Sequence, residues 1–128
     1  MDLSGEDNVH SDSDIVNDVG MVGDDFHEMI EKYSKQFSVD LSDYLWYYHC
    51  GEEGVSIGAI FFNPPNLRVK RIPVTPNMLT EYANKGKWNF IYPDTKLPKR
   101  RYDILINQVV VGLFISVLLF WAIIKLIN

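Results

Sequence analysis

The stretch Ile104–Ile127 reads ILINQVVVGLFISVLLFWAIIKLI, and its part from Val109 to Ile124 contains no charged residue. As a helix, the residues from Ile104 to Ile124 would extend for about 31 Å, close to the thickness of the hydrocarbon core of a bilayer. Burying a helix that is apolar on every face would require far more chain than the remaining residues provide. The sequence therefore predicts one membrane-spanning helix in this stretch.

Charged and aromatic residues on both sides of this stretch predict its orientation. Several basic residues precede it, whereas only Lys125 lies at its far end. Because positive charge is retained on the cytoplasmic side, we expect the N-terminal part of the chain to be cytoplasmic. Aromatic rings near the two ends should lie at the two membrane–water interfaces. The predicted membrane-flanking residues are Lys96, Lys99, Arg100, Arg101, Tyr102 and Trp121.

The two halves of the chain carry opposite charge. Residues 1–53 contain fourteen Asp and Glu against two Lys, a net charge of −12, whereas residues 54–128 contain ten Lys and Arg against three acids, a net charge of +7. The basic half is suited to contact with anionic lipid headgroups, and no separate basic patch indicates nucleic acid as a partner. The single Cys50 cannot form an internal disulfide, which agrees with a reducing cytosol.

Composition divides the chain into four parts. We expect residues 1–13 to be a disordered acidic tail, because they are polar and have no hydrophobic periodicity. Residues 14–92 should form one small folded domain, and residues 93–103 should form a basic, proline-containing linker. Residues 104–127 are the predicted transmembrane anchor.

Two segments of the domain are predicted to be helices. In residues 24–37, apolar side chains recur with helical spacing, and Asp25 with Glu28 fits a capping box. The second helix, residues 76–85, is framed by Thr75 as N-cap and Gly86 as C-cap. The predicted buried faces contain Phe26, Met29, Ile30, Tyr33 and Phe37 in the first helix, and Leu79, Tyr82 and Ala83 in the second, with Trp88 behind them.

The other segments of the domain are short. Residues 43–49 should form a short helix or an irregular turn whose aromatic side chains belong to the core rather than to a ligand site. Residues 55–74 contain two apolar runs around a proline pair, which predicts either a β-hairpin or a short helix followed by one strand. The aromatic residues concerned are Tyr44, Trp46, Tyr47 and Tyr48. The predicted fold class is therefore an α-rich α+β domain followed by a single transmembrane helix.

Separated segments of the chain resemble known families. The run DVGMVGDDF (18–26), the helix that ends at Phe37 and the following SVDL (38–41) resemble the central part of acyl carrier proteins. The helix start GDD, the segment VDLSDY and the later VTPNMLTEYANKGKW resemble, in this order, the enterobacterial family called domain of unknown function (DUF) 1493. The resemblance covers residues 14–90. It implies an acyl-carrier-like helical domain and a location in the bacterial inner membrane, but no catalytic residue.

The chain departs from the carrier pattern where a carrier holds its prosthetic group. Carriers attach phosphopantetheine to the serine of an Asp-Ser-Leu triplet, and the matching triplet here is Val22-Gly23-Asp24. Gly23 has no hydroxyl, so we expect no prosthetic group and no other cofactor. The first carrier helix also has no counterpart in residues 1–13. A partner protein, a homodimer or the aromatic segment 44–48 would then cover the exposed flank of the helix 24–37.

Motifs that carry chemistry are sparse. His49, Cys50, Glu52 and Glu53 could supply metal ligands, but a structural zinc site needs more Cys or His residues than the chain offers here. Cys50 could be a nucleophile, but its immediate neighbour His49 is badly placed to act as its base. We interpret this segment as a surface turn. We therefore predict no catalytic, cofactor-binding or metal-binding residue and no enzymatic activity.

Acidic residues at the start of the helix 24–37 are the best candidates for binding a partner, because carrier-like domains present an acidic helix to basic patches. We assign this role to Asp24, Asp25, Glu28 and Glu31. The predicted function is a tail-anchored binding or regulatory module with an unidentified basic protein partner. The alternatives are a small structural subunit of a membrane complex, whose anchors pack through Gly112 and Ser116, and a carrier that uses another serine.

Overall fold

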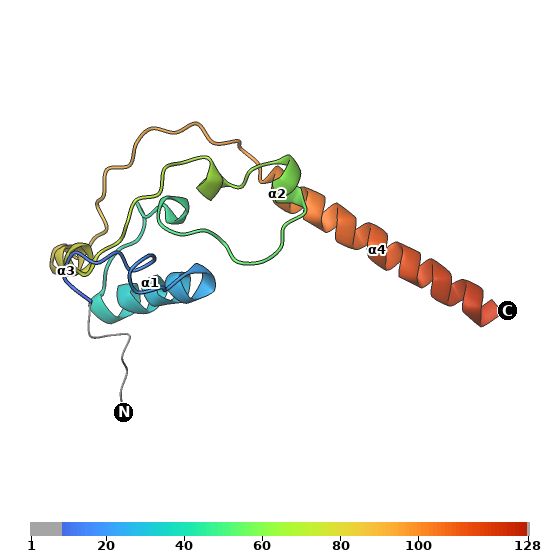
Figure 1. The fold of residues 1–128 in the computed structure, drawn as a ribbon, viewed down its shortest axis with the longest axis horizontal. Coiled ribbons are helices and arrows are strands. Elements are labelled where there is room, and N and C mark those ends of the chain that lie inside the picture. The colour runs from blue at the N-terminus through green and yellow to red at the C-terminus, as the bar shows by residue number, and fades with distance from the viewer. Residues whose placement is uncertain (1–8, 128) are drawn as a thin grey trace, which may run out of the picture. The chain divides into compact units, whose positions relative to one another are not determined.

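The computed structural model describes residues 9–127 of the chain. In this range the regular structure is almost entirely helical, as the ribbon in Figure 1 shows. The expected α-rich architecture with one long apolar C-terminal helix is confirmed. The elements are α1 (Gly23–Phe37), the 3-10 turn η1 (Trp46–Tyr48), α2 (Gly58–Phe61), the 3-10 turn η2 (Pro65–Leu67), α3 (Pro76–Lys85) and α4 (Tyr102–Ile127).

The predicted α+β class is wrong for the described part of the chain. No strand forms there, and the β-type pairing consists of an isolated parallel bridge between Asp40 and Lys87. In residues 55–74 the expected short helix is present as α2, but no strand follows it. Pro73 lies within the apolar run that follows the proline pair, and a proline has no backbone N–H to donate to a neighbouring strand.

Backbone contacts divide the chain into two compact units, which are described separately below. The globular unit extends to Glu53 and resumes over Pro65–Thr95. The anchor unit comprises Gly54–Pro64 and the chain from Lys96 onward. The sequence analysis placed residues 54–64 in the folded domain, whereas in the structure α2 packs on α4. A short insertion in the globular unit therefore belongs structurally to the anchor.

α1 is stable in the globular unit because its apolar residues share one face. The predicted helix is confirmed, and it begins at Gly23, one residue earlier than expected. Successive turns each place a side chain in the core, as the 3.6-residue period requires. These side chains are Phe26, Ile30 and Tyr33, all of which are buried. Of the other two residues predicted for the buried face, Met29 is partly buried, whereas Phe37 is 50% exposed, because it lies in the last turn of the helix.

The ends of α1 differ from the prediction. The expected capping box is wrong, because the N-cap residue is Val22, which provides no side-chain hydrogen bond, and Asp25 lies inside the first turn. At this position Asp25 still interacts favourably with the positive end of the helix dipole. The helix ends at Ser38, whose left-handed conformation (φ 53°) directs its N–H to the carbonyl of Ser34.

The predicted bounds and caps of α3 are confirmed. The hydroxyl of Thr75 accepts a hydrogen bond from the N–H of Met78 at 3.3 Å. The helix ends at Gly86, whose φ of 70° is a conformation that glycine adopts without strain. Tyr82 on the inner face contacts Trp88, with the two ring centroids 4.6 Å apart. The sequence was sufficient to predict both ends of α3, because each cap depends only on residues close to it in the chain.

The predicted disordered tail, residues 1–13, lies partly outside the described residues, which begin at position 9. In its described part, the carbonyl of Ser11 accepts a hydrogen bond from the N–H of Asn77 at 3.0 Å. The carboxylate of Asp12 accepts another from the Asn77 side chain at 2.7 Å. The first of these bonds satisfies an N–H at the start of α3 that has no partner within the helix.

The core of the globular unit is small and rich in aromatic rings. Of the four aromatic residues predicted to lie in it, Tyr48 is fully buried, whereas the other three are partly exposed. His49, which the sequence analysis did not place in the core, is completely buried. The buried apolar cluster consists of Ile15, Val16, Phe26, Ile30, Tyr33, Val39, Cys50, Val74, Tyr82 and Trp88.

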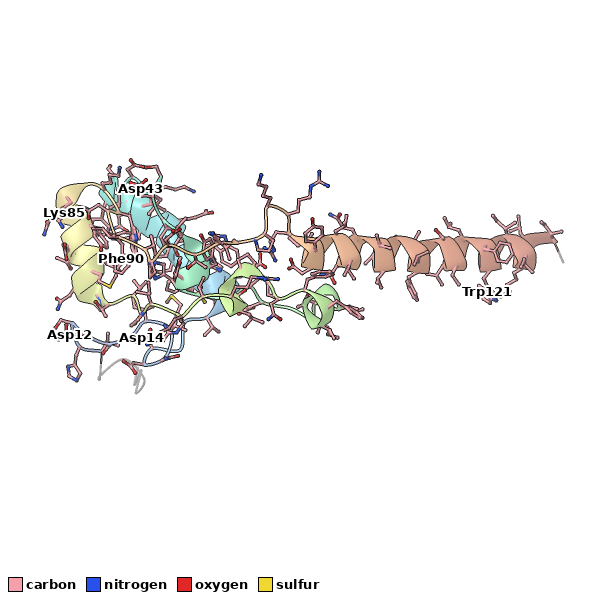
Figure 2. The ribbon with its side chains drawn as sticks, turned by 90° about the horizontal axis from the view of Figure 1, so that it is seen from above. Asp12, Asp14, Asp43, Lys85, Phe90 and Trp121 are labelled. Carbon is pink, nitrogen blue, oxygen red and sulfur yellow. The ribbon has the colours of Figure 1, made fainter. Side chains whose placement is uncertain are left out.

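Within residues 9–127, α4 is the helix that is long and apolar enough to cross a membrane, and no part of its most apolar window is buried. It begins at Tyr102, two residues before the predicted anchor. Trp121 lies near its C-terminal end (Figure 2) and is largely exposed. Length and composition therefore agree with the predicted anchor.

Candidate functional site

The four acidic residues predicted to bind a partner are divided between two grooves of the globular unit. At about 100° per residue, all four side chains lie within an arc of about 120° on α1, and the fold around the helix divides them into two pairs: Asp24 with Glu31, and Asp25 with Glu28. Each pair lines a separate groove of the globular unit. We call the groove beside Asp25 and Glu28 the methionine groove, and the groove beside Asp24 and Glu31 the aromatic groove.

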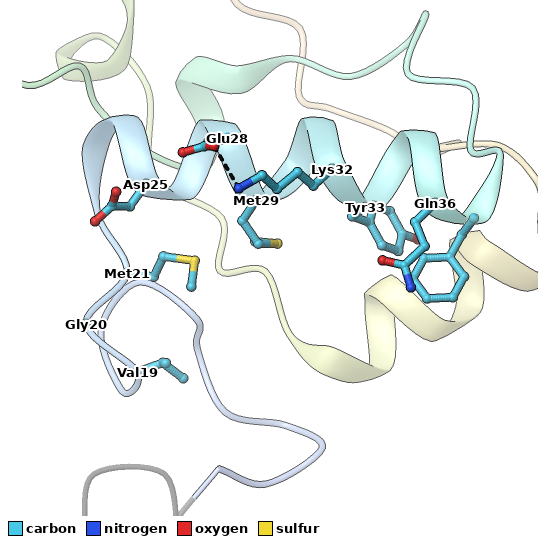
Figure 3. Close-up of a pocket in the computed structure, with 10 residues that line it drawn as sticks. Val19, Gly20, Met21, Asp25, Glu28, Met29, Lys32, Tyr33 and Gln36 are labelled. Atoms are coloured by element: carbon cyan, nitrogen blue, oxygen red, sulfur yellow. Dashed lines mark ion pairs between the residues drawn. The ribbon is translucent and has the colours of Figure 1, made fainter. Parts of the chain in front are cut away.

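The methionine groove, of about 670 Å³, lies between the loop that precedes α1 and one flank of the helix (Figure 3). Met21 and Met29 extend into the space between the loop and the helix. At its rim, the carboxylate of Glu28 lies 2.7 Å from Nζ of Lys32, and this hydrogen-bonded ion pair lowers the pKa of Glu28. The groove is lined by Val19, Gly20, Met21, Asp25, Glu28, Met29, Lys32, Tyr33, Gln36 and Phe37.

The aromatic groove has a volume of about 450 Å³. α1 provides one wall of it, and the chain that follows α1, including the start of η1, provides the other wall. Three of its side chains are aromatic and three are carboxylates. The groove is lined by Asp24, His27, Ile30, Glu31, Leu41, Tyr44, Trp46 and Glu52.

The rings of the aromatic groove are held in place by their neighbours. The rings of His27 and Trp46 meet edge to face, with centroids 5.8 Å apart. Nε2 of His27 lies 3.2 Å from the carbonyl of Gly51, which can only accept a hydrogen bond, so this nitrogen carries the proton. Tyr44 stacks on the buried His49 ring, with centroids 5.3 Å apart and an angle of 6° between the planes. The walls are therefore largely preorganised.

The charge on the aromatic groove is one-sided. Asp24, Glu31 and Glu52 contribute three carboxylates, and no Lys or Arg is among the residues that line it. Glu31 pairs with Lys35, which lies outside this lining, at 3.8 Å, and both of these side chains are well exposed. In the methionine groove, Lys32 is itself one of the lining residues, and it pairs with Glu28 at 2.7 Å. The aromatic groove thus combines ring faces with an excess of negative charge.

The segment His49–Cys50 is not the surface turn that we expected. Both residues are buried because the chain after η1 enters the core. Nδ1 of His49 donates to the carbonyl of Ile72 at 2.9 Å, and Nε2 accepts from the hydroxyl of Tyr92 at 2.6 Å. The sulfur of Cys50 accepts a hydrogen bond from the N–H of Gly23 at 3.2 Å. Both side chains therefore fix the fold of this segment.

The environment of His49 keeps its ring neutral. Burial is the main cause, and together with the charge of Arg71 it lowers the pKa of His49 to about 4, although the hydrogen bond to Ile72 acts in the opposite direction. Tyr92 reinforces this state, because its hydroxyl oxygen also accepts hydrogen bonds from Nε1 of Trp88 and the N–H of Leu45. A protonated Nε2 would have no free acceptor there.

Gly23 occupies the position at which a carrier has its serine, and the backbone there is built for glycine. It is buried and has φ of 54°, which side chains of L-residues rarely adopt. A Cβ atom at this position would also overlap the side chain of Glu53. A serine at position 23 would therefore be strained.

Among residues 9–127, no three His, Cys, Asp or Glu side chains are grouped so that they could hold a metal ion. The sequence analysis considered Glu52 only as a possible metal ligand, and it did not consider His27 as a member of a binding site. His27 carries no distinctive motif in the sequence. Glu52 reaches α1 only because the chain folds back between Tyr48 and Glu53, which short-range patterns do not reveal.

Comparison with known proteins gives one match. The family model described as "Protein of unknown function (DUF1493)" matches residues 2–92, which is most of the chain. No curated protein and no solved structure shows a significant match. The matched region includes all residues of both grooves and ends before α4. The chain therefore belongs to the DUF1493 family of proteins of unknown function.

Proposed function

We propose that the protein is a membrane-anchored, non-enzymatic binding module whose aromatic groove receives a cationic side chain from a basic segment of a partner protein. The observation that carries this proposal is that the carboxylates of Asp24 and Glu31 lie beside the aromatic walls of a groove that no Lys or Arg lines. The acyl-carrier-like character of the domain remains a part of this proposal that rests on sequence resemblance alone.

The chemistry of the aromatic groove matches an arginine side chain well. A guanidinium group can lie against the ring of Trp46 or Tyr44, where cation–π attraction is worth about 0.5–2 kcal/mol. Its N–H groups can donate to the carboxylates of Asp24 and Glu31. The apolar side chains of Ile30 and Leu41 can contact its aliphatic stem.

The methionine groove is less suited to a basic partner. The ion pair between Glu28 and Lys32 already neutralises one of its two carboxylates. Its floor is lined by flexible and aromatic apolar side chains, which would favour an apolar contact instead. Of the four acidic residues predicted to bind a partner, we therefore assign Asp24 and Glu31 to the cationic contact.

The anchor would hold the binding module at a membrane surface. We propose that α4 spans the bacterial inner membrane once and that the globular unit lies in the cytoplasm, because the basic residues Lys99, Arg100 and Arg101 precede the helix. Holding the groove at the membrane raises its effective concentration towards partners on the same surface. Weak binding in solution would then suffice for function.

Binding of a short arginine-rich peptide to the full chain in lipid nanodiscs tests the proposal, with fluorescence anisotropy as the measurement. A peptide with citrulline in place of arginine is the control, because it keeps the shape but loses the charge. Glu31→Gln should weaken binding by about fivefold, whereas Glu28→Gln should change it by less than about twofold. These two variants are matched, since each carboxylate pairs with a lysine four residues later on α1.

Two results would contradict the proposal. Equal binding of the arginine and citrulline peptides would remove the cationic contact. Equal loss in Glu31→Gln and Glu28→Gln would indicate unspecific attraction to an acidic helix. If replacement of residues 104–127 by an unrelated apolar helix abolishes cellular function while peptide binding is retained, the structural-subunit alternative is favoured instead.

A further inference from the structure

We propose that the segment Val55–Phe62 is a second membrane-contacting element, which lies in the bilayer interface beside the start of α4. This inference rests on the proposed membrane anchoring by α4. Its first support is exposure: Val55 is 99%, Ile60 78% and Phe61 68% exposed, although all three are large and apolar. A cluster of this kind in a short segment needs a non-aqueous partner.

The segment is attached to α4 by specific hydrogen bonds within the anchor unit. The side-chain oxygen of Asn107 accepts from the N–H of Gly58 at 2.8 Å, and its amide nitrogen donates to the hydroxyl of Ser56 at 3.0 Å. The same hydroxyl accepts the N–H of Ala59 at 3.1 Å. α2 therefore has a fixed position on α4 (Figure 1).

Close packing brings the two backbones together. A Cβ atom at Gly58 would overlap the carbonyl of Asp103, so glycine is required for this approach. The ring of Phe62 contacts that of Tyr102, with centroids 5.5 Å apart. Tyr102 is the aromatic residue that we expect at the near interface of the membrane, and Phe62 extends its apolar surface.

The position along α4 places the segment at the depth of the interface. Asn107 lies three residues into the predicted span, which corresponds to about 4.5 Å along the helix. An amide side chain at this depth would be costly if its hydrogen-bonding groups were left facing lipid. Ser56 and Gly58, at the start of α2, supply their partners, so this part of the segment must lie at the same level as Asn107.

The charges of the anchor unit agree with contact to lipid rather than water. The segment 54–64 contains no charged residue, and Lys99, Arg100 and Arg101 stand directly before α4, where they can meet anionic headgroups. The segment belongs to the same compact unit as α4, which also exposes large apolar side chains along its length. The occupant that fits this surface is therefore the bilayer.

Spin labelling of the full chain in phospholipid vesicles tests the inference. Cysteines replace Ile60, Phe61, Leu118 or Lys35 one at a time, and power saturation compares the accessibility of each label to oxygen and to a water-soluble nickel complex. The native Cys50 is buried, and the unsubstituted chain shows how much label it takes up. The inference predicts preferential access of oxygen at positions 60 and 61, as at position 118, and of nickel at position 35.

The outcomes separate this inference from the proposed anchoring. Nickel access at positions 60 and 61, with oxygen access at position 118, would overturn the inference and leave the anchor in place. Nickel access at position 118 would overturn the anchor and the inference together. Low access of both reagents at positions 60 and 61 would indicate a protein contact and would also overturn the inference. Ile60→Cys and Phe61→Cys change exposed side chains, so both variants are expected to fold.

Discussion

The hydroxyl of Tyr92 donates a hydrogen bond to Nε2 of His49 over 2.6 Å, and this bond fixes the imidazole in its neutral form. The same oxygen accepts hydrogen bonds from Nε1 of Trp88 at 2.9 Å and from the N–H of Leu45 at 3.3 Å. Nδ1 of His49 donates in turn to Ile72. These contacts join the chain after α1 to the end of the globular unit. Because they require a neutral His49 ring, they make the stability of the globular unit sensitive to acid.

Acid should destabilise the globular unit before its carboxylates are protonated. His49 has a pKa of about 4 in the folded protein, below the value of about 6.5 in an unfolded chain. The unfolded state therefore binds more protons between these values, and stability falls as the pH decreases through this window. Between pH 7 and pH 5 we expect a loss of about 2 kcal/mol.

Urea unfolding of the full chain in detergent micelles, followed by tryptophan fluorescence, measures this loss. In His49→Gln the difference between the two pH values should disappear, even if the variant is less stable overall. His27→Gln is the control, because it removes an imidazole of the aromatic groove and leaves His49 in place. In this variant the difference in stability between the two pH values should persist. Equal stability of the unsubstituted chain at both pH values would contradict the account of His49.

Tyr92→Phe should destabilise the globular unit by about 2–3 kcal/mol, because it leaves two hydrogen-bonding groups of fully buried side chains and one partly buried N–H without a partner. The affected groups are on His49, Trp88 and Leu45. Tyr47→Phe is the control, since the described residues offer its hydroxyl no hydrogen bond and the side chain is partly exposed. The same urea titration at pH 7 compares both variants, and equal stabilities would show that the Tyr92 hydroxyl has no such role.

Gly58→Ala should detach α2 from α4, because the added methyl group would overlap a backbone carbonyl that cannot move aside cheaply. Chymotrypsin cleavage after Phe61 and Phe62, in detergent, should then become several times faster than in the unsubstituted chain. Gly112→Ala is the matched control, because its Cβ would meet nothing within 4 Å. An unchanged cleavage rate in Gly58→Ala would argue against the close packing.

Trp46→Leu should weaken binding of the arginine-rich peptide about threefold or more, because it removes a ring face from the aromatic groove while leaving its three carboxylates. Tyr47→Leu provides the control, since Tyr47 does not line the groove. Titrations at two salt concentrations complete the test. The contribution of the carboxylates should decrease with salt, whereas the ratio between these two variants should change little. Identical affinities of both variants would exclude a role for the ring.

Features set by short-range rules could be predicted from the sequence. α3 was predicted with both caps, because Thr75 and Gly86 act on their immediate neighbours. The buried face of α1 followed from the spacing of Phe26, Ile30 and Tyr33. The start of α1 was predicted to within one residue, but its N-cap was not, because Val22 offers no capping side chain and nothing in its residue type marks a helix boundary.

Features that depend on long-range contacts were missed. His49 looked like part of a polar turn, and it is buried because Ile72 and Tyr92 supply its hydrogen bonds. The acidic residues of α1 looked like one surface, but the fold assigns them to two grooves and adds Glu52 to one of them. The attachment of α2 to α4 depends on Asn107, which is 49 residues from Gly58.

The most direct test of the proposed function is an NMR titration of the full chain in nanodiscs, observing the indole N–H signals of its three tryptophans. The arginine-rich peptide is added first, and the citrulline peptide is the control. The account predicts that the signal of Trp46 shifts with the arginine peptide alone, while Trp88 in the core and Trp121 on α4 stay unchanged. No shift of Trp46, or an equal shift with citrulline, would contradict the claim that the aromatic groove receives a cationic side chain.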